Sequence, residues 1–158
     1  MFKIALCDDD ASFLDFLQNL LLIEFSAHNC NIHIEKFISG KKLIESVEKN
    51  MEIYDIIFLD INMPEISGLS IADKLRQLDD KFILIFTTNM ENDAPRGYRY
   101  NAFRFILKRT LRSDIQEAIS TILYKSTCLN DETIELKYKH KDTYNLMTVK
   151  KKISFTLK

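Results

Sequence analysis

The sequence predicts an α/β fold, a doubly wound sheet of five parallel strands with helices on both faces. Short apolar runs alternate with amphipathic stretches of helical length along most of the chain. Two of these runs, 54–60 and 81–88, are almost continuously apolar, as in strands that are covered on both faces. Because alternating strands and helices form parallel sheets through right-handed crossovers, few other topologies remain.

Five strand–helix repeats follow from the apolar periodicity. The strands are expected at residues 2–7, 31–37, 54–60, 81–88 and 102–108. The helices are expected at 10–25, at 39–50, through Ile71, Leu75 and Leu78, at 91–100, and from Ser113 onward. The first helix is expected to carry an apolar face of Phe13, Phe16, Leu17 and Leu20. Asp10 is expected to start this helix, and Ser113 and Gln116 form a capping-box pattern for the last one.

Length and composition restrict the class of protein. The 158 residues suffice for one ordinary domain and a short extension. No apolar run reaches the roughly 18–20 residues of a membrane helix, and the acidic start is not a signal peptide. Three cysteines without paired spacing indicate a reducing compartment. We therefore expect a cytoplasmic protein without a membrane partner.

Charge separates an acidic body from a basic tail. Residues 1–132 carry 15 Lys and Arg against 21 Asp and Glu, whereas residues 133–158 carry 7 against 2. This asymmetry suggests two parts with different partners. Apolar residues alternate in the tail as in two or three strands, at Ile134, Leu136, Tyr138, Ile153, Phe155 and Leu157. The tail is too short to build a core of its own.

Polar residues stand at the carboxyl ends of four expected strands: Asp8 and Asp9, Asp60, Thr87 and Lys108. In sheets of this kind, ligands bind beyond the carboxyl ends of the strands. Three neighbouring carboxylates repel one another, and a divalent cation such as Mg²⁺ relieves that repulsion through oxygen ligands. A lysine and a hydroxyl could stabilise a phosphoryl group in transfer. Asp60, at the end of a central strand, is best placed to accept it as an aspartyl phosphate.

These residues resemble the receiver domain of two-component response regulators. The segment "CDDD" is similar to the acid pair of that family, and "FLDINMPEISG" to its phosphoacceptor strand and loop. "LIFTT" is similar to the strand that carries its switch hydroxyl, and "FRFILK" to its fifth strand with an aromatic residue and a lysine. The resemblance covers residues 1–125 and implies a flavodoxin-like strand order, 2-1-3-4-5.

The resemblance implies a Mg²⁺-dependent phosphoacceptor that catalyses only its own phosphorylation and hydrolysis. Asp60 would accept the phosphoryl group from a sensor histidine kinase. Asp9 would bind the metal directly and Asp8 would bind it through water. Asn62 would contribute its backbone carbonyl to the same metal. The phosphorylated chain would change conformation and control an output, with transcription the expected process.

The resemblance also implies which residues respond to the phosphoryl group. Thr87 and Lys108 would bind its oxygens, and Phe105 would change rotamer with the switch. Arg109 stands where the family usually has a proline, which bears on the geometry of that loop. The alternative for Phe105 is an ordinary core position.

"YNAFRFILK" and the tail segment "TIELKYKHKDTYNLM" resemble the LytTR-type (AgrA-like) subfamily. We therefore expect a receiver at 1–125, a linker at 126–132, and at 133–158 either the stub of a LytTR-type DNA-binding domain or a β-rich tail. DNA is an expected partner only where a complete output domain is present. Residues 96–112 contain no acid, and besides Lys108 they carry five arginines: Arg96, Arg99, Arg104, Arg109 and Arg112. These could form a docking or homodimer face near the fourth and fifth strands, could contact nucleic acid phosphate, or could be a solvated surface.

Two other functions compete with the phosphorylated switch. A hydrolase of the haloacid dehalogenase type also forms an aspartyl phosphate, but it carries a second Asp two residues after the first, where this chain has Asn62. A binding module with the receiver fold that is not phosphorylated usually lacks a key residue, and none is missing here.

Overall fold

The computed structural model describes residues 1–50, 54–89, 100–131, 133–140 and 143–150. It contains two compact units, Met1–Ala118 and Ile119–Lys158. None of the helices in these ranges combines the length and the apolar character needed to cross a membrane.

The first unit contains a parallel sheet of five strands in the order β2-β1-β3-β4-β5. The strands are β1 Phe2–Cys7, β2 Ile32–Phe37, β3 Ile56–Asp60, β4 Ile83–Thr88 and β5 Arg104–Leu107. The predicted fold class and strand order are therefore confirmed. Strand β3 lies at the centre, and all five of its residues are buried, as its apolar run requires.

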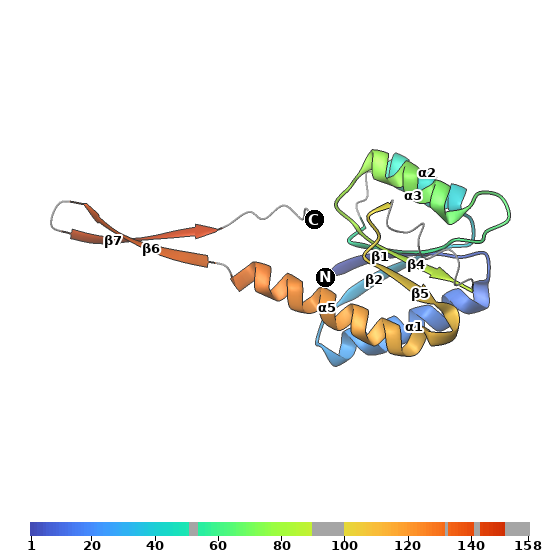
Figure 1. Ribbon diagram of the computed structural model, residues 1–158, viewed down its shortest axis with the longest axis horizontal. Helices are drawn as coiled ribbons and strands as arrows, with labels where there is room; N and C mark the ends of the chain where they lie inside the picture. The colour runs from blue at the N-terminus through green and yellow to red at the C-terminus, as the bar shows by residue number, and fades with distance from the viewer. Residues whose placement is uncertain (51–53, 90–99, 132, 141–142, 151–158) are drawn as a thin grey trace. The chain divides into compact units, whose positions relative to one another are not determined.

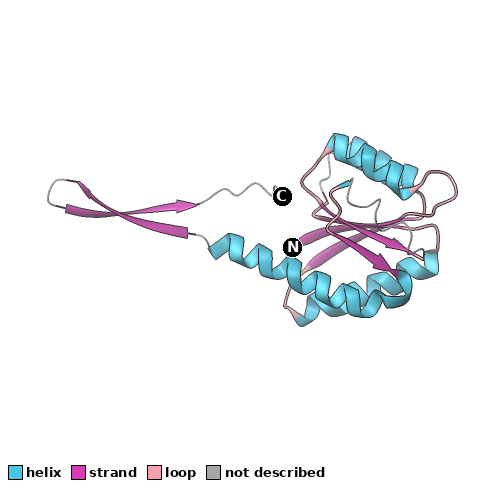
Figure 2. Cartoon of the chain, in the orientation of Figure 1, coloured by secondary structure: helices cyan, strands magenta, loops and turns pink. Residues whose placement is uncertain are grey.

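Helices cover both faces of this sheet (Figures 1 and 2). They are α1 Ala11–Ala27, α2 Gly40–Asn50, α3 Gly68–Leu78 and α5 Leu111–Asp131, the last preceded by a 3₁₀ turn at Lys108–Thr110. Helices α2 and α3 lie on one face, and α1 lies on the other (Figure 1). The helix predicted at 91–100 falls, except for Tyr100, outside the described residues.

The buried face of α1 differs in part from the predicted one. Five residues of α1 are buried: Leu14, Leu17, Leu20, Leu21 and Phe25. Phe16 is 40% exposed and Phe13 is half-buried, so only Leu17 and Leu20 of the expected apolar face are buried. The segment is apolar at so many positions that the spacing fits two faces, and only contact with the sheet selects one. The helix predicted through Ile71, Leu75 and Leu78 is confirmed as α3; Ile71 and Leu75 are buried, whereas Leu78, its last residue, is 50% exposed.

The start of α5 also differs from the prediction. The helix begins at Leu111, directly after the 3₁₀ turn, so Ser113 lies inside it and is not the N-cap. The Ser113 hydroxyl donates a hydrogen bond to the Thr110 carbonyl at 2.9 Å. The apolar stripe behind it is confirmed, since Ile115, Ala118, Ile119 and Ile122 are all buried.

The second unit contains an antiparallel hairpin of β6 Thr133–His140 and β7 Thr143–Lys150. Their register pairs Thr133 with Lys150 at one end and His140 with Thr143 at the other. Helix α5 continues through most of the segment expected to be a linker and ends at Asp131. Residues 151–158, where alternation suggests a further strand, lie outside the described residues. The division into receiver, linker and output stub stays a prediction.

Candidate functional site

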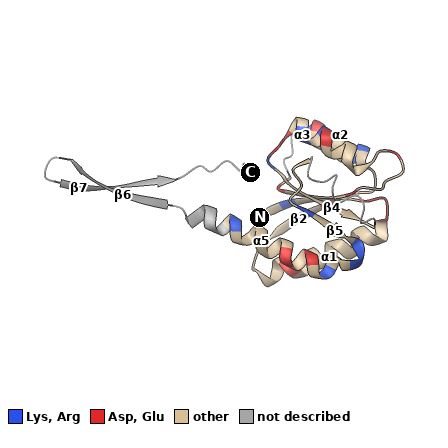
Figure 3. Cartoon of the chain, viewed as in Figure 1, with Lys and Arg blue, Asp and Glu red and all other residues tan. Residues whose placement is uncertain are grey.

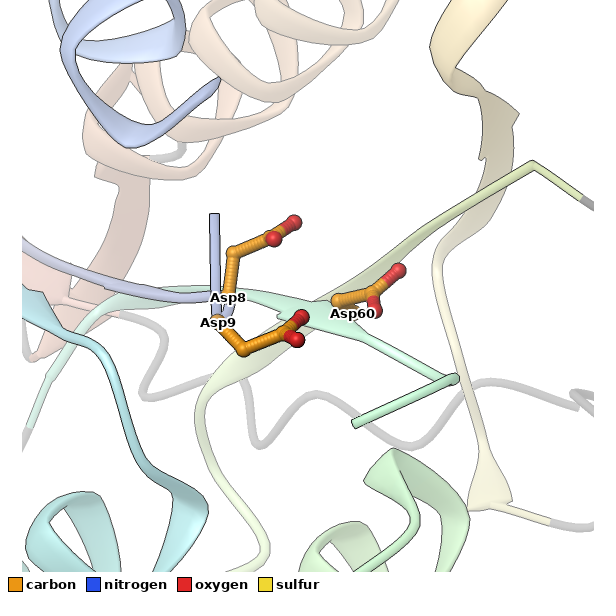
Figure 4. A group of neighbouring side chains, drawn as sticks. All are labelled: Asp8, Asp9 and Asp60. Atoms are coloured by element: carbon orange, nitrogen blue, oxygen red, sulfur yellow. The ribbon is translucent and has the colours of Figure 1, made fainter. Parts of the chain in front are cut away.

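The carboxyl ends of the strands bring the predicted polar residues to one edge of the sheet. Asp8 and Asp9 follow β1, and Asp60 ends β3, the strand beside it. Asp60 is paired in register with Thr87 of β4. One carboxylate oxygen from each of Asp8, Asp9 and Asp60 lies within 4.8 Å of the other two (Figure 4). The acidic cluster expected from the sequence is therefore present.

The acids after β1 have separate local roles. The amide of Asp10 donates a hydrogen bond to Asp8 Oδ1 at 3.0 Å, which orients the Asp8 side chain. The Asp10 carboxylate caps α1 by accepting hydrogen bonds from the amides of Ser12 and Phe13, at 2.9 and 3.2 Å. Asp10 thus starts the helix, as the sequence predicts. Asp9 is exposed, so its carboxylate remains accessible at the mouth of the cluster.

The loop after β3 is folded tightly around Asp60. Asp60 is 3% exposed, and its Oδ2 accepts a hydrogen bond from the Asn62 amide at 3.1 Å. The Gly68 amide donates to the Ile61 carbonyl at 2.9 Å, which closes the loop. A Cβ atom at residue 68 would lie 2.0 Å from the Asp60 carbonyl oxygen. Only glycine allows this approach, so Gly68 helps to position the acid.

Lys108 reaches the cluster from the end of β5. Its Nζ lies 2.7 Å from Asp8 Oδ2 and 3.4 Å from Asp60 Oδ1, and its side chain is 14% exposed. The contact between Lys108 and Asp8 is an ion pair whose angles do not suit a hydrogen bond. Asp8 Oδ2 therefore accepts no hydrogen bond from the described residues. The same Nζ lies 4.3 Å from the centroid of the Phe13 ring.

The electrostatics of the cluster show an excess of negative charge. Burial raises the pKa of Asp60 to about 6, and the nearby Asp8 carboxylate adds to this effect against the opposing charge of Lys108. Burial also raises the pKa of Asp8 despite its contact with Lys108. For Lys108, burial acts to lower the pKa, but Asp8 and Asp60 outweigh it and the pKa is raised. One ammonium group therefore does not compensate the three carboxylates.

A hard divalent cation fits this cluster. Three carboxylates offer oxygen atoms within a few ångströms, and Asp8 Oδ2 keeps unused capacity as an acceptor. Mg²⁺ prefers oxygen ligands and is held in many proteins by one or two carboxylates together with water and phosphate oxygens. The donor set and its unbalanced charge suit such an ion.

The two predicted switch residues lie in β4 and β5. Thr87 is 1% exposed and stands beside Asp60 in the sheet. Phe105 is half-buried, and its ring centroid lies 5.6 Å from that of Phe86. Tyr100 packs against the same Phe86 ring at 6.3 Å. Phe105 thus belongs to a cluster of aromatic rings around Phe86, which lies in β4, the strand that carries Thr87.

Three of the five arginines that could form a partner face lie among the described residues: Arg104, Arg109 and Arg112. Arg96 and Arg99 lie outside the described residues. Arg104 Nη2 lies 2.6 Å from Glu117 Oε1, and this contact lowers the pKa of Glu117. Arg112 lies over the Phe16 ring at 5.4 Å. Helix α5 continues beyond the acid-free segment 96–112 and contributes the acids Asp114 and Glu117. Basic and acidic residues therefore occur together on the helices α1 and α5 (Figure 3).

The loop around Arg109 is a single 3₁₀ turn. Lys108, Arg109 and Thr110 form this turn, which leads directly into α5. No cis peptide bond occurs among the described residues. Where the family usually has a proline, this chain thus has Arg109 in a 3₁₀ turn. That turn still places Lys108 beside the acids.

Sequence reasoning missed two contacts of the site. The Phe13 ring lies against Lys108, although its spacing suggested only a core position. The Asn62 side-chain amide donates a hydrogen bond to Thr88 Oγ1 at 3.1 Å, which joins the loop after β3 to the end of β4. Both contacts link residues far apart in the chain, so no local spacing signals them.

Comparison with known proteins assigns the first unit to a family. The family model of the response regulator receiver domain matches residues 4–120. The sensory transduction protein LytR of Staphylococcus epidermidis is 31% identical over 139 residues, which cover 86% of this chain and 52% of that protein. The response regulator ArlR of Staphylococcus saprophyticus is 31% identical over 123 residues, which cover 77% of this chain and 51% of that protein. The chain spans about half the length of the curated relatives it matches.

Solved structures share the fold at lower identity. The response regulatory domain of protein mrkE from Klebsiella pneumoniae has a TM-score of 0.69 at 23% identity and covers 80% of this chain and 98% of that one. The response regulator protein TrrA from Thermotoga maritima, in complex with Mg(2+)-BeF, has a TM-score of 0.66 at 22% identity and covers 77% and 99%.

Residues 4–120, matched by the family model, include the carboxyl ends of all five strands. They therefore include the three carboxylates, Thr87 and Lys108. The strand order and the acidic cluster agree with that match. The chain therefore belongs to the response regulator receiver domain family.

Proposed function

We propose that this chain is a phosphorylation-controlled switch in which Asp60 accepts a phosphoryl group from a sensor histidine kinase. The observation that carries the proposal is the placement of Asp60 at the end of β3, with Asp8 and Asp9 oxygens within 4.8 Å and Lys108 Nζ at 3.4 Å. A buried carboxylate with two further acids beside it and a lysine that contacts both Asp60 and Asp8 suits phosphoryl transfer to oxygen.

In the transfer step, an Asp60 carboxylate oxygen uses a lone pair to form a bond with phosphorus. The bond between phosphorus and the donor breaks, and its electron pair leaves with the donor: a histidine nitrogen of the kinase or the carboxylate oxygen of acetyl phosphate. Lys108 stabilises the negative charge on the phosphoryl oxygens, and the Thr87 hydroxyl donates to one of them.

The residues that would hold Mg²⁺ are Asp8, Asp9 and Asp60 with the backbone carbonyl of Asn62. TrrA, a structural neighbour, was solved in complex with Mg(2+)-BeF, which supports the proposal of a Mg²⁺ ion in this chain. When bound, the ion would supply positive charge that offsets the repulsion between the acids and the incoming phosphoryl group. Asp8 serves a second purpose, since its Oδ2 holds the Lys108 ammonium group in place.

The proposed output follows from the charge of about −2 that the phosphoryl group adds to Asp60. Thr87 would move toward this charge, and Phe105 would change rotamer in the space that Thr87 leaves. The surface near β4 and β5 would then form a homodimer or release an output domain. We place this switch in the cytoplasm, with transcription as the controlled process.

Similarity to the sensory transduction protein LytR supports a LytTR-type output, with residues 133–158 as either the stub of a DNA-binding domain or a β-rich tail. A phosphoacceptor also accounts for the site better than a hydrolase does. The general acid of a hydrolase would stand at residue 62, where the Asn62 amide instead donates to Thr88. We therefore propose no turnover of external substrates.

The test is the intact mass of the protein after incubation with Mg²⁺ and acetyl phosphate. We expect a gain of one phosphoryl group in the wild type and in Asp73→Asn, which changes an exposed acid on α3. We expect no gain in Asp60→Asn. Labelling that persists in Asp60→Asn would contradict the acceptor, and an unlabelled wild type that also binds no Mg²⁺ would favour a binding module.

A further inference from the structure

The Phe13 ring is a part of this site that the phosphoacceptor chemistry leaves without a role. Phe13 lies in the first turn of α1, and Lys108 Nζ lies 4.3 Å from its ring centroid. The same ammonium group lies 2.7 Å from Asp8 Oδ2 and 3.4 Å from Asp60 Oδ1. Lys108 therefore contacts two carboxylates and one ring.

A ring holds a cation differently from a carboxylate. The attraction arises from the ring quadrupole and is strongest where water is excluded, as it largely is for the 14% exposed Lys108 side chain. It does not require a fixed N–H direction, whereas a hydrogen bond does. The three N–H donors of Lys108 therefore remain available for oxygen acceptors.

The position of the ring depends on the same residues that orient the acids. The Asp10 carboxylate accepts a hydrogen bond from the Phe13 amide at 3.2 Å, and the Asp10 amide donates to Asp8 Oδ1 at 3.0 Å. The helix cap thus connects the backbone of Phe13 to the carboxylate that holds Lys108. Because the cap bonds the backbone amide of Phe13, a substitution of its side chain keeps the cap. Such a substitution should therefore affect Lys108 more than it affects the helix.

We propose that Phe13 is a positioning residue for Lys108. This inference rests on the proposed function, because its consequence is for phosphoryl transfer to Asp60. The ring keeps the ammonium group beside Asp8 and Asp60 before the phosphoryl group arrives. When the phosphoryl group arrives, the Lys108 ammonium group can turn an N–H toward a phosphoryl oxygen. It keeps its attraction to the ring, because that attraction does not depend on the N–H direction.

Three variants separate this role from simple packing. Phe13→Leu keeps an apolar side chain and removes the ring, whereas Phe13→Tyr keeps the ring. Phe16→Leu is the matched control, since Phe16 lies in the next turn of α1 and its ring lies near Arg112 at 5.4 Å. Phe16 is 40% exposed, so the control should fold as the wild type does.

The first measurement is the NMR position of the Lys108 ε-methylene protons, assigned by their loss in Lys108→Arg. Protons that lie over a ring face are shifted upfield by its ring current. We expect this shift in the wild type, in Phe13→Tyr and in Phe16→Leu, and its loss in Phe13→Leu. A wild-type signal at the ordinary lysine position, or one that Phe13→Leu leaves unchanged, would overturn the proposal.

The second measurement is the rate of labelling by acetyl phosphate with Mg²⁺ as its concentration is varied. We expect Phe13→Leu to lower the rate about fivefold, and Phe13→Tyr to stay within about twofold of the wild type. Equal rates in the Leu and Tyr variants would mean that the ring only packs. If the wild type itself is not labelled and binds no Mg²⁺, the proposed function fails, and the NMR signal alone decides whether Phe13 holds Lys108.

Discussion

Asp60 is the residue in which structure and chemistry are most closely coupled. It is almost completely buried, and burial together with the Asp8 carboxylate raises its pKa to about 6. The metal-free fold therefore holds the ionised form, which would attack phosphorus, less favourably than water does. A cation bound at the cluster would stabilise that form by offsetting the negative charge that the single lysine leaves uncompensated.

At this scale we predict that Asp60→Asn stabilises the metal-free protein near pH 7. Because the folded-state pKa is raised from 3.8 to about 6, this group favours folding below about pH 4, and that contribution is lost as the pH rises through about 6. Because Asn cannot ionise, the variant avoids this loss. Its free energy of unfolding at pH 7 should therefore be about 1–3 kcal/mol higher than that of the wild type. The measurement is urea unfolding in EDTA at several pH values.

The pH dependence distinguishes this effect from a general gain. The difference between Asp60→Asn and the wild type should shrink toward pH 4, because the wild-type carboxyl group is then protonated and resembles the amide. Asp73→Asn, which changes an exposed acid, should follow the wild type at every pH. A stability difference that does not vary between pH 4 and 7 would contradict the raised pKa.

At the scale of elements, Arg76 ties the end of α3 to two other segments. Its guanidinium group donates to the backbone carbonyls of Asp80 and Phe82, at 2.8 and 3.0 Å, and to those of Tyr100 and Asn101, both at 3.2 Å. It also stacks on the Phe82 ring at 3.9 Å. Since Tyr100 packs on Phe86, this arginine fixes the chain that leads into β5.

We therefore predict that Arg76→Met lowers the free energy of unfolding by about 2–4 kcal/mol, because it leaves several carbonyls without their charged donor. The free energy of unfolding of Arg76→Lys should lie between those of the wild type and Arg76→Met, since an ammonium group cannot fully replace the planar guanidinium fork. Lys74→Met, at an exposed position of the same helix, is the control and should change stability by less than about 0.5 kcal/mol. Equal unfolding midpoints for the two methionine variants in urea would show that water replaces Arg76.

At the scale of the whole molecule, the acidic cluster joins strands that are distant in sequence. Asp8 and Asp9 follow the first strand, Asp60 ends the third, and Lys108 follows the fifth, so the cluster forms only when the sheet does. A ligand that binds this cluster binds the folded chain and not the unfolded one. Folding and metal binding should therefore be linked.

We predict that Mg²⁺ raises the unfolding temperature, by about 4–8 °C when its concentration is ten times its dissociation constant. Removal of the metal with EDTA should reverse the shift. Asp9→Asn should reduce the shift, because Asp9 is the accessible acid of the cluster. Differential scanning calorimetry checks this, and an equal Mg²⁺ effect in the wild type and in Asp9→Asn would argue against the assigned ligand.

The sequence by itself determined the fold class and the acidic cluster, and its resemblance to the receiver family implied the strand order. The fold class and the cluster depend on local features: an apolar run predicts a buried strand, and a polar residue at the end of that run lies at its carboxyl edge. A parallel sheet brings such edges together whatever the details of packing. Asp8, Asp9, Asp60, Thr87 and Lys108 could therefore be found without coordinates, as could the helix-starting role of Asp10.

Only the tertiary structure decided which side chains surround that cluster and which helix faces are buried. Phe13 contacts Lys108, Asn62 contacts Thr88, and Arg104 pairs with Glu117 because the crossovers bring these elements side by side. The apolar positions of α1 fit two faces, and packing on the sheet selected the one with Leu14, Leu17 and Leu21. Such contacts join residues with no fixed spacing in the chain, so their chemistry is settled by packing in three dimensions.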